Sequence, residues 1–217
     1  MLIHAASGSA PCLATWRACK VLGDGSFGRV LLAENIETKE VMAVKVISKA
    51  LIEANQQVRN TINEIFINVC SKNCRALVQC YYIYEDGGAL YIFMEFMQGG
   101  EMFHLLSHSQ YLSEEKVKFA GACWVLGIEA LHEMGMIYHG GKTEDFLLTA
   151  DGYLKLADFG LCEYASTSKS LCGTPEYVSP EMIARKQHTK MVDFWTLGVL
   201  LFELIVGIPP FYHKNRS

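Results

Sequence analysis

The sequence lacks an excess of positive charge. Of its 217 residues, 19 are Lys or Arg and 23 are Asp or Glu, which gives a formal net charge of −4 at pH 7. Nucleic-acid-binding surfaces neutralise phosphates with clustered Lys and Arg, so we expect no nucleic-acid partner. With 51% hydrophobic and 19% charged residues, the composition is that of a folded, mildly acidic globular chain.

The sequence also lacks the common membrane signals. Its first residues, MLIHA, have neither a positively charged opening nor a sustained apolar core, and Leu2 stands where myristoylation requires glycine. The apolar stretch 192–206 is shorter than the roughly 20 residues of a membrane span and contains Asp193 near its start. We expect a buried helix there, no membrane partner, and a cytoplasmic protein with the nucleus as a second location.

A cysteine pattern that would complete a metal site is missing. The eight cysteines are scattered, mostly within apolar segments, which indicates reduced packing residues. Cys70 and Cys74 have helical spacing and can share one metal ion, but no second close pair of Cys or His completes a tetrahedral set. We expect packing rather than metal binding.

What the first part of the chain does contain is strand patterns. Short alternating or apolar runs are separated by glycine turns and polar turns, which is typical of an antiparallel sheet. One longer segment between them has a helical pattern. The predicted strands are 19–22, 28–34, 40–48, 76–84 and 89–96, and the predicted helix is 58–70.

The second part of the chain predicts helices. Ser113 can cap a helix, and Glu114 and Glu115 suit its positive start. Apolar residues then recur at helical spacing until Gly135. This stripe consists of Val117, Ala120, Trp124, Ile128 and Leu131. The fold class predicted from both parts is α+β, with a small sheet-rich part followed by a mainly helical one.

Five motifs occur in one order along the chain. They are GDGSFGRV at 23–30, AVK at 43–45, DFG at 158–160, SPE at 179–181 and DFWTLG at 193–198. In this order and with these gaps they resemble the protein kinase family, from about Trp16 onward. GGEMF at 99–103 and LCGTPEY at 171–177 resemble the AGC group, in particular the catalytic domains of cyclic-nucleotide-dependent kinases.

The resemblance implies a bilobal protein-kinase-like fold. Its N-lobe would be a small antiparallel sheet with one helix, and its C-lobe would be mainly helical. The expected divisions are an N-terminal extension at 1–15, the N-lobe at 16–96, and the hinge with the C-lobe at 97–217. Relatives in this family continue through several more helices, so we expect a truncated C-lobe with an exposed apolar patch, which marks a partner site or an aggregation liability.

The resemblance also implies ATP binding. Backbone N–H groups of a glycine loop approach phosphate oxygens without side-chain clash, and Lys45 adds a positive charge that Glu64 holds in place. The same glycines can also be ordinary hairpin glycines. The implied ATP-binding residues are Leu22, Gly23, Gly25, Ser26, Phe27, Gly28, Val30, Ala43, Lys45, Glu64, Met94, Glu95, Met97, Glu101 and Leu147.

By the same resemblance, Asp158 and Asp145 are the expected ligands of Mg²⁺. Asp158 keeps the D-F-G carboxylate, and Asp145 replaces the family's asparagine with another hard oxygen ligand. Either aspartate can instead cap a turn.

The segment YHGGKTED at 138–145 departs from the family's catalytic loop. Gly140 stands where the family has the aspartate that takes the proton of the substrate hydroxyl. Loss of a positioned base costs a factor of about 10² to 10⁴ in rate. Lys142 remains to steady the transferring phosphate, and we do not expect Glu144 or Asp145 to replace the base.

The expected activation segment contains Ser170 and Thr174. Ser170 occupies the place of the phosphorylated residue, yet the basic pocket around that place is replaced, by alignment, with His139, Glu163 and Asn60. We therefore expect that a phosphate on Ser170 would not order the segment.

Glu101, Glu144 and Glu203 align with acidic positions that bind arginines of basic substrates. They suggest docking of a basic peptide or protein, including the pseudosubstrate segment of a regulatory subunit. The favoured function is a Mg²⁺-dependent ATP-binding pseudokinase with impaired catalysis. The alternatives are a weakly or conventionally active serine/threonine kinase and a non-functional fragment.

Overall fold

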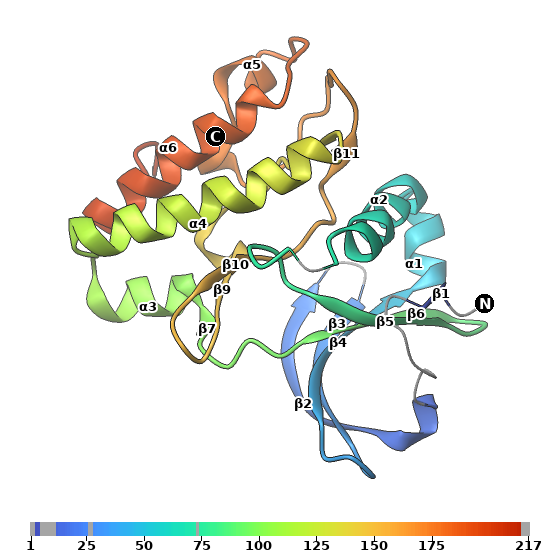
Figure 1. Cartoon of the computed structure of the whole chain (residues 1–217). Helices are drawn as coiled ribbons and strands as arrows, with labels where there is room; N and C mark the ends of the chain where they lie inside the picture. Colours follow the sequence, from blue (N-terminus) through green and yellow to red (C-terminus); the bar gives the residue numbers. More distant parts are fainter. Residues whose placement is uncertain (1–2, 5–11, 26–27, 73, 214–217) are drawn as a thin grey trace. The chain divides into compact units, whose positions relative to one another are not determined.

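The structure is a computed structural model and describes residues 3–4, 12–25, 28–72 and 74–213. The chain divides into two compact units. Unit 1 comprises Met1–Asn73 and Val78–Met97, and unit 2 comprises Cys74–Leu77 and Gln98–Ser217. The predicted α+β class, with a sheet-rich first part and a mainly helical second part, is confirmed (Figure 1).

Unit 1 is built on a six-stranded antiparallel sheet with the strand order β1-β5-β6-β4-β3-β2. Gly25 at the end of β2 pairs with Gly28 at the start of β3, and a tight turn at 85–89 joins β5 to β6, as the glycine and polar turn residues there predict. The strands are β1 (Ile3–His4), β2 (Trp16–Gly25), β3 (Gly28–Asn35), β4 (Val41–Ser48), β5 (Cys80–Glu85) and β6 (Ala89–Glu95).

Two helices follow β4. The predicted helix is present with the predicted bounds as α2 (Val58–Cys70). A shorter helix, α1 (Lys49–Ala54), was not predicted, and Ser48 caps it by accepting a hydrogen bond from Leu51 N–H. Six residues are too few to show a helical period, which is why the sequence did not reveal it.

Each face of this sheet buries its own cluster. On the helix face, Ile52 of α1 packs with Ile47, Cys80, Ile83 and Ile92 of the strands. On the opposite face, aromatic rings gather around Phe93. Period-two alternation sends successive side chains to opposite faces, so one set of strands supplies both clusters.

Unit 2 is mainly helical. Its helices are α3 (Met102–Ser109), α4 (Glu114–Glu133), α5 (Pro180–Ile183) and α6 (Met191–Val206), with the 3-10 turns η2 (Thr143–Asp145) and η3 (Pro175–Tyr177). Its short strands form two small sheets, ordered β10-β9-β7 and β11-β8. They are β7 (Gly100–Glu101), β8 (Met136–Ile137), β9 (Phe146–Leu148), β10 (Leu154–Leu156) and β11 (Glu163–Tyr164).

The long helices α4 and α6 lie side by side (Figure 1), and Gly121 on α4 leaves room for Leu201 on α6. The predicted stripe of α4 is buried as expected. Ser113 stands at the N-cap of α4, but its side chain makes no capping hydrogen bond, so that part of the prediction was wrong. No helix in the described part of the chain is long and apolar enough to cross a membrane.

Residues 74–77 belong to unit 2 although they lie in sequence between α2 and β5. Leu77 forms a parallel bridge with Leu156, and Leu156 N–H donates to the Ala76 carbonyl over 2.9 Å. The chain therefore enters unit 2 briefly before completing the sheet of unit 1.

Candidate functional site

In unit 1, the strand register aligns the expected phosphate-binding residues. Gly23 on β2 pairs with Val30 on β3, and Val30 pairs with Lys45 on β4. One row across three strands thus carries a glycine, an apolar side chain and a cation. Ser26 and Phe27, which were also predicted to bind ATP, lie outside the described residues.

The glycines of this loop have different steric roles. A Cβ on Gly28 would lie 1.8 Å from the Val46 carbonyl oxygen, so Gly28 is required for the close approach of β3 to β4. Among the described residues, a Cβ on Gly23 would meet nothing within 4 Å, and one on Gly25 would touch only Gly28. The ordinary-hairpin interpretation therefore explains Gly28 but leaves Gly23 unexplained.

Lys45 on β4 and Glu64 on α2 form the predicted ion pair. Lys45 Nζ lies 2.5 Å from Glu64 Oε1, and the two side chains are 24% and 7% exposed. Because Glu64 is buried and Lys45 retains access to solvent, the pair holds a cation at the surface of the sheet. These residues suit the phosphates of a nucleotide.

The other residues of unit 1 that were predicted to bind ATP differ in exposure. Ala43 and Met97 are buried, Met94 packs against the helix-face cluster, and Leu22 is exposed. The Glu95 carboxylate accepts a hydrogen bond from Gln79 N–H over 2.8 Å.

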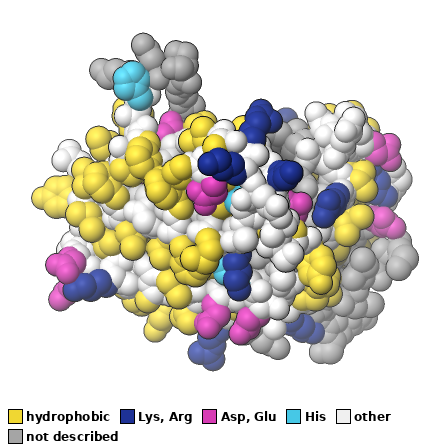
Figure 2. All heavy atoms as spheres, turned by 90° about the horizontal axis from the view of Figure 1, so that it is seen from above, with side chains coloured by type: hydrophobic (Ala, Val, Ile, Leu, Met, Phe, Trp, Pro, Cys, Tyr) yellow, Lys and Arg dark blue, Asp and Glu magenta, His cyan; other side chains and the backbone are white. Residues whose placement is uncertain are grey.

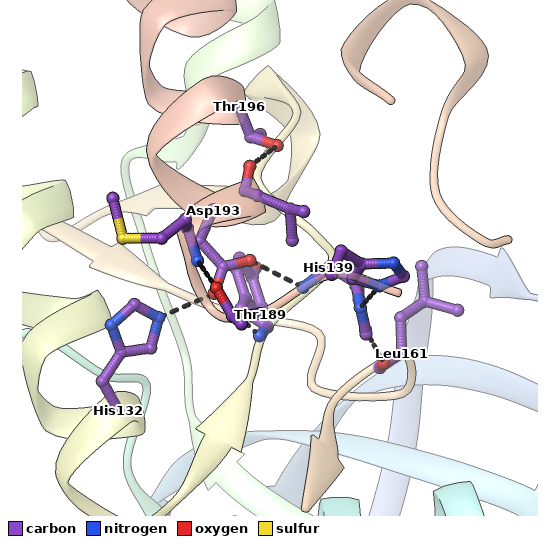
Figure 3. Close-up of polar contacts among 10 residues, drawn as sticks. His132, His139, Leu161, Thr189, Asp193 and Thr196 are labelled. Carbon is purple, nitrogen blue, oxygen red and sulfur yellow. Dashed lines mark hydrogen bonds and ion pairs between the residues drawn. The ribbon is translucent and has the colours of Figure 1, made fainter. Parts of the chain in front are cut away.

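In unit 2, Asp193 holds the loop that contains Gly140. Asp193 is fully buried at the start of α6 and accepts hydrogen bonds from Tyr138 N–H at 3.1 Å and His139 N–H at 3.0 Å. Its Oδ2 also lies 2.7 Å from His132 Nε2 (Figure 3). His139 adopts a left-handed backbone with φ of 57°, which these contacts stabilise.

Gly140 is covered by an aromatic ring. A Cβ built on Gly140 would lie 2.8 Å from Tyr138 Cζ and 3.1 Å from two further ring carbons. The ring is fully buried and its hydroxyl donates to the Ala157 carbonyl over 2.8 Å. Any larger residue at 140 therefore requires the Tyr138 ring to shift, which the sequence did not reveal.

The Asp145 side chain caps the backbone that follows Gly140. Its Oδ2 accepts hydrogen bonds from Gly141 N–H at 2.8 Å and Lys142 N–H at 3.2 Å. Burial and, to a smaller extent, the neighbouring Asp158 raise the pKa of the Asp145 carboxyl to about 7 against the opposing effect of the two backbone donors and Lys142. The turn-capping alternative for Asp145 is thus present in the structure.

Asp158 differs from Asp145 because it is exposed. It adopts a left-handed backbone with φ of 54°, and its Oδ1 lies 3.4 Å from Gly160 N. Two carboxylates that repel each other, one of them open to solvent, fit a divalent cation that keeps several waters. No group of three or more His, Cys, Asp or Glu in the described ranges is arranged to hold a metal ion, so these two residues would supply one or two ligands and not a full cage.

Comparison with known proteins identifies the family. The family model described as protein kinase domain matches residues 16–217. The chain belongs to the protein kinase family. It is 37% identical over 202 residues to the RAC serine/threonine-protein kinase of Drosophila melanogaster, and 39% over 200 residues to serine/threonine-protein kinase gad8 of Schizosaccharomyces pombe. It is also 37% identical over 209 residues to a RAC family serine/threonine-protein kinase homolog of Dictyostelium discoideum.

These relatives are AGC-group kinases, as the motifs predicted. The alignments cover 91%, 90% and 94% of this chain but only 33%, 35% and 47% of the three relatives, so the chain spans less than half of their length. The narrower likeness to cyclic-nucleotide-dependent kinases stays a prediction, as do the ATP-binding, metal-binding and docking roles of individual residues and the division at 1–15, 16–96 and 97–217.

A carboxylate holds the segment that the sequence predicts to be the activation segment. Glu163 Oε2 accepts hydrogen bonds from the hydroxyls of Ser168 at 2.6 Å and Ser170 at 3.0 Å. A phosphate on Ser170 would therefore face a negative charge, in agreement with the alignment. Thr174 precedes η3 and its side chain makes no capping bond.

The carboxylates predicted to dock a basic peptide are not equivalent. Glu203 is buried and accepts a hydrogen bond from the Tyr177 hydroxyl. Burial raises the pKa of Glu203, and repulsion from Glu144 and Glu176 adds to the rise. Glu144 and Glu203 thus lie close enough to interact, and Glu176, which the sequence analysis did not select, joins them. Glu101 is partly exposed on β7, where it pairs with Leu147.

Asn68 is buried on α2. Its Nδ2 donates to the Glu64 carbonyl over 2.8 Å, and its Oδ1 has no partner among the described residues. An unpaired buried oxygen costs about 1–3 kcal/mol, so this kinase helix carries a locally unfavourable residue.

Proposed function

We propose that this kinase-domain protein binds ATP with Mg²⁺, is catalytically impaired, and acts as a regulatory or binding pseudokinase. The observation that carries the proposal is Gly140, which has no side chain at the position of the catalytic base and is covered by the Tyr138 ring. Phosphoryl transfer needs an oriented hydroxyl and an acceptor for its proton.

Nucleotide binding is supported by the residues of unit 1. The Lys45–Glu64 pair is formed, and no residue that the structure describes lies within 4 Å of a Cβ placed on Gly23. Bound Mg²⁺ would be held by Asp158, with Asp145 as a second oxygen donor, and would neutralise phosphate charge. Lys142 would contribute a further positive charge toward the phosphates.

The proposed partner is a basic peptide or protein, such as a regulatory subunit or a pseudosubstrate segment. It is supported by the electrostatic interaction of Glu203 with both Glu144 and Glu176. Guanidinium groups bind carboxylates through paired charge-assisted hydrogen bonds, so an arginine-containing segment suits this cluster. We place the protein in the cytoplasm, with the nucleus as a second location.

Nucleotide binding is tested by thermal unfolding of the 217-residue chain. Mg²⁺ and ATP at about 100 times Kd should stabilise the fold by about 2.7 kcal/mol, seen as a rise in Tm. Lys45→Ala should abolish the rise, whereas Lys118→Ala, which removes an exposed lysine on α4, should keep it. Soluble wild-type protein with an unchanged Tm would refute nucleotide binding.

Impaired catalysis is tested with an arginine-containing peptide and labelled ATP. Wild-type transfer should stay at background. Gly140→Asp combined with His139→Arg should raise it about 10² to 10⁴-fold if the loop alone limits the rate, whereas Gly140→Asn, with matched size but no base, should not. The Tyr138 ring must move in both variants, so Tm is measured alongside.

An active serine/threonine kinase is the second candidate, because the Lys45–Glu64 pair that active kinases need is already formed. Brisk peptide labelling by the wild-type chain that is lost in Asp158→Ala would favour it over the pseudokinase. A chain that stays insoluble with or without ligand would favour a non-functional fragment.

A further inference from the structure

Two buried histidines of unit 2 face each other through the same ring atom. His139 Nε2 lies 3.1 Å from His188 Nε2, and the ring planes are nearly perpendicular at 81°. Both residues are buried. The nitrogen on the other side of each ring also faces an acceptor, because His139 Nδ1 lies 3.4 Å from the Leu161 carbonyl and His188 Nδ1 lies 3.2 Å from the Lys186 carbonyl (Figure 3 shows the contact of His139 with Leu161).

These contacts limit how many protons the pair can hold. A carbonyl oxygen only accepts, so His188 Nδ1 carries a proton to bond the Lys186 carbonyl, and the neutral His188 ring offers Nε2 as an acceptor. A neutral His139 ring can donate to it from Nε2 and forgo the longer contact with Leu161, and with one extra proton it can donate from both nitrogens. A second extra proton would place an N–H on both Nε2 atoms and break the hydrogen bond between them. The closed pair therefore carries at most one proton beyond the two of the neutral rings. Separated imidazoles take up one extra proton each.

Other charges around the pair come from three elements. Asp193 on α6 accepts from the backbone N–H of His139, and Glu163 on β11 interacts electrostatically with the His139 ring. His132 on α4 lies on the other side of Asp193, and the partly buried thiol of Cys172 lies near both carboxylates. The negative charges of Asp193 and Glu163 stabilise one shared proton. They do not remove the repulsion between two Nε2–H groups that point at each other.

The pair joins the loop around Gly140 to the activation segment. His188 and Ser168 exchange two backbone hydrogen bonds, each of 2.9 Å. Ser168 in turn donates to Glu163, which also holds Ser170. A movement of His188 therefore acts on the activation segment through the backbone hydrogen bonds between His188 and Ser168.

We propose that the His139–His188 contact is an acid-sensitive latch that holds the activation segment through Ser168 when closed and releases it when both imidazoles become protonated. The open state binds at least one proton more than the closed state. Its population relative to the closed state should therefore rise about tenfold per pH unit below the ordinary histidine range near pH 6.5.

The surroundings of His139 favour the same pH dependence. Burial lowers the pKa of His139 below its usual value of 6.5, so the closed state takes up even its first proton less readily than an exposed ring. Because the folded, closed state binds fewer protons in this window, its stability is complete above about pH 6.5 and falls as pH drops. Proton uptake and opening thus reinforce each other.

The test is hydrogen exchange of the 217-residue chain between pH 5 and 8, corrected for intrinsic exchange rates. The amides of Ser168 and His188 report the opening of the bridge. In the wild type, the opening constant should increase about tenfold between pH 6 and pH 5. In His188→Gln, where only the His139 imidazole remains to take up a proton, the increase should be clearly smaller. A pH-independent opening in the wild type, or the wild-type slope in His188→Gln, would overturn the latch.

Two controls separate the latch from other titrating groups. His108→Gln removes an exposed histidine on α3 and should leave the slope unchanged. Asp145→Asn removes the carboxyl whose pKa is about 7 and should also leave it unchanged, and loss of the slope in this variant would overturn the assignment to the histidine pair.

Two further measurements do not depend on a stable variant. Imidazole NMR shifts of the wild type should show full protonation of both rings together with loss of Ser168 protection. Two fully protonated rings with Ser168 still protected would contradict the latch. Zinc ion added at pH 7.5 should not protect Ser168, whereas protection that is lost in His188→Gln would assign the pair to metal binding instead.

Discussion

At the scale of single residues, Asp145 combines two demands on one carboxyl group. It caps the loop around Gly140 by accepting two backbone hydrogen bonds, and it is the expected second ligand of Mg²⁺. Burial and the nearby Asp158 raise its pKa to about 7. The carboxylate is therefore costly in the absence of a cation, and its protonation relieves the cost.

Asp145→Asn should stabilise the protein, more at pH 8 than at pH 5. The folded pKa of about 7 lies above the usual aspartate value of 3.8, so the folded state binds more protons between these values and loses stability as pH rises. Asparagine keeps an acceptor oxygen for Gly141 and Lys142 but has no charge. Urea unfolding should show a gain that is larger at pH 8 by on the order of 1–3 kcal/mol.

The matched control is Asp151→Asn, which changes an exposed carboxyl in the turn between β9 and β10. Its effect on the free energy of unfolding should stay within about 0.5 kcal/mol at both pH values. An equal gain for Asp145→Asn at pH 5 and pH 8 would contradict the raised pKa.

At the scale of elements, the β2–β3 hairpin contains glycines with different steric roles. A Cβ on Gly28 would overlap the backbone of β4, whereas one on Gly23 would meet no described residue within 4 Å. A sequence motif treats the two glycines as equivalent. Only the space around each glycine in the structure distinguishes them.

Gly28→Ala should destabilise the protein by more than about 2 kcal/mol, because its Cβ would overlap the Val46 carbonyl. Gly23→Ala should change the free energy of unfolding by less than about 1 kcal/mol and yet reduce the Tm rise with Mg²⁺ and ATP. Denaturant unfolding and ligand-dependent thermal unfolding measure the two effects. Equal destabilisation by both substitutions would show that the two positions do not differ.

Elements with a clear period were predictable from sequence. The bounds of α2 and the buried stripe of α4 follow from the spacing of apolar residues. Helix α1 and the two- or three-residue strands β7, β8, β9, β10 and β11 are too short to show a period. Their positions depend on long-range pairing instead.

The sequence likewise predicted some features of the candidate site and not others. Motifs selected Lys45, Glu64 and Asp158, because kinase chemistry requires those residue types in that order, and the same comparison singled out Gly140 as a departure from the family pattern. No motif predicted that the Tyr138 ring covers Gly140 or that His188 faces His139. Both facts depend on how segments distant in the sequence pack together.

At the scale of the whole molecule, the surface of α6 is unusual for its lack of charge. Asp193 and Glu203 are both buried, so the exposed positions of this helix carry no charged side chain. Hydrophobic side chains spread over a broad part of the face shown in Figure 2. The exposed hydrophobic residues of α6 are Met191, Phe194, Phe202, Ile205 and Val206.

The 217-residue chain should therefore associate as its concentration rises, since large exposed apolar areas favour association. Phe202→Lys, at an exposed position of α6, should reduce association without lowering Tm by more than a few degrees. Phe103→Lys, at a similarly exposed position on α3, should reduce it less. Light scattering over a concentration series measures the difference, and equal effects of both variants would exclude α6 as the main contact.

The short excursion of residues 74–77 into unit 2 matters for anyone who dissects this protein. A recombinant fragment that starts at Gln98 would omit Ala76, whose carbonyl pairs with Leu156 N–H, and Leu77, which is completely buried. Unit 2 therefore cannot be expressed as one contiguous stretch of the chain. A fragment that contains all of unit 2 needs residues 74–77 attached, for example through a designed linker ahead of Gln98.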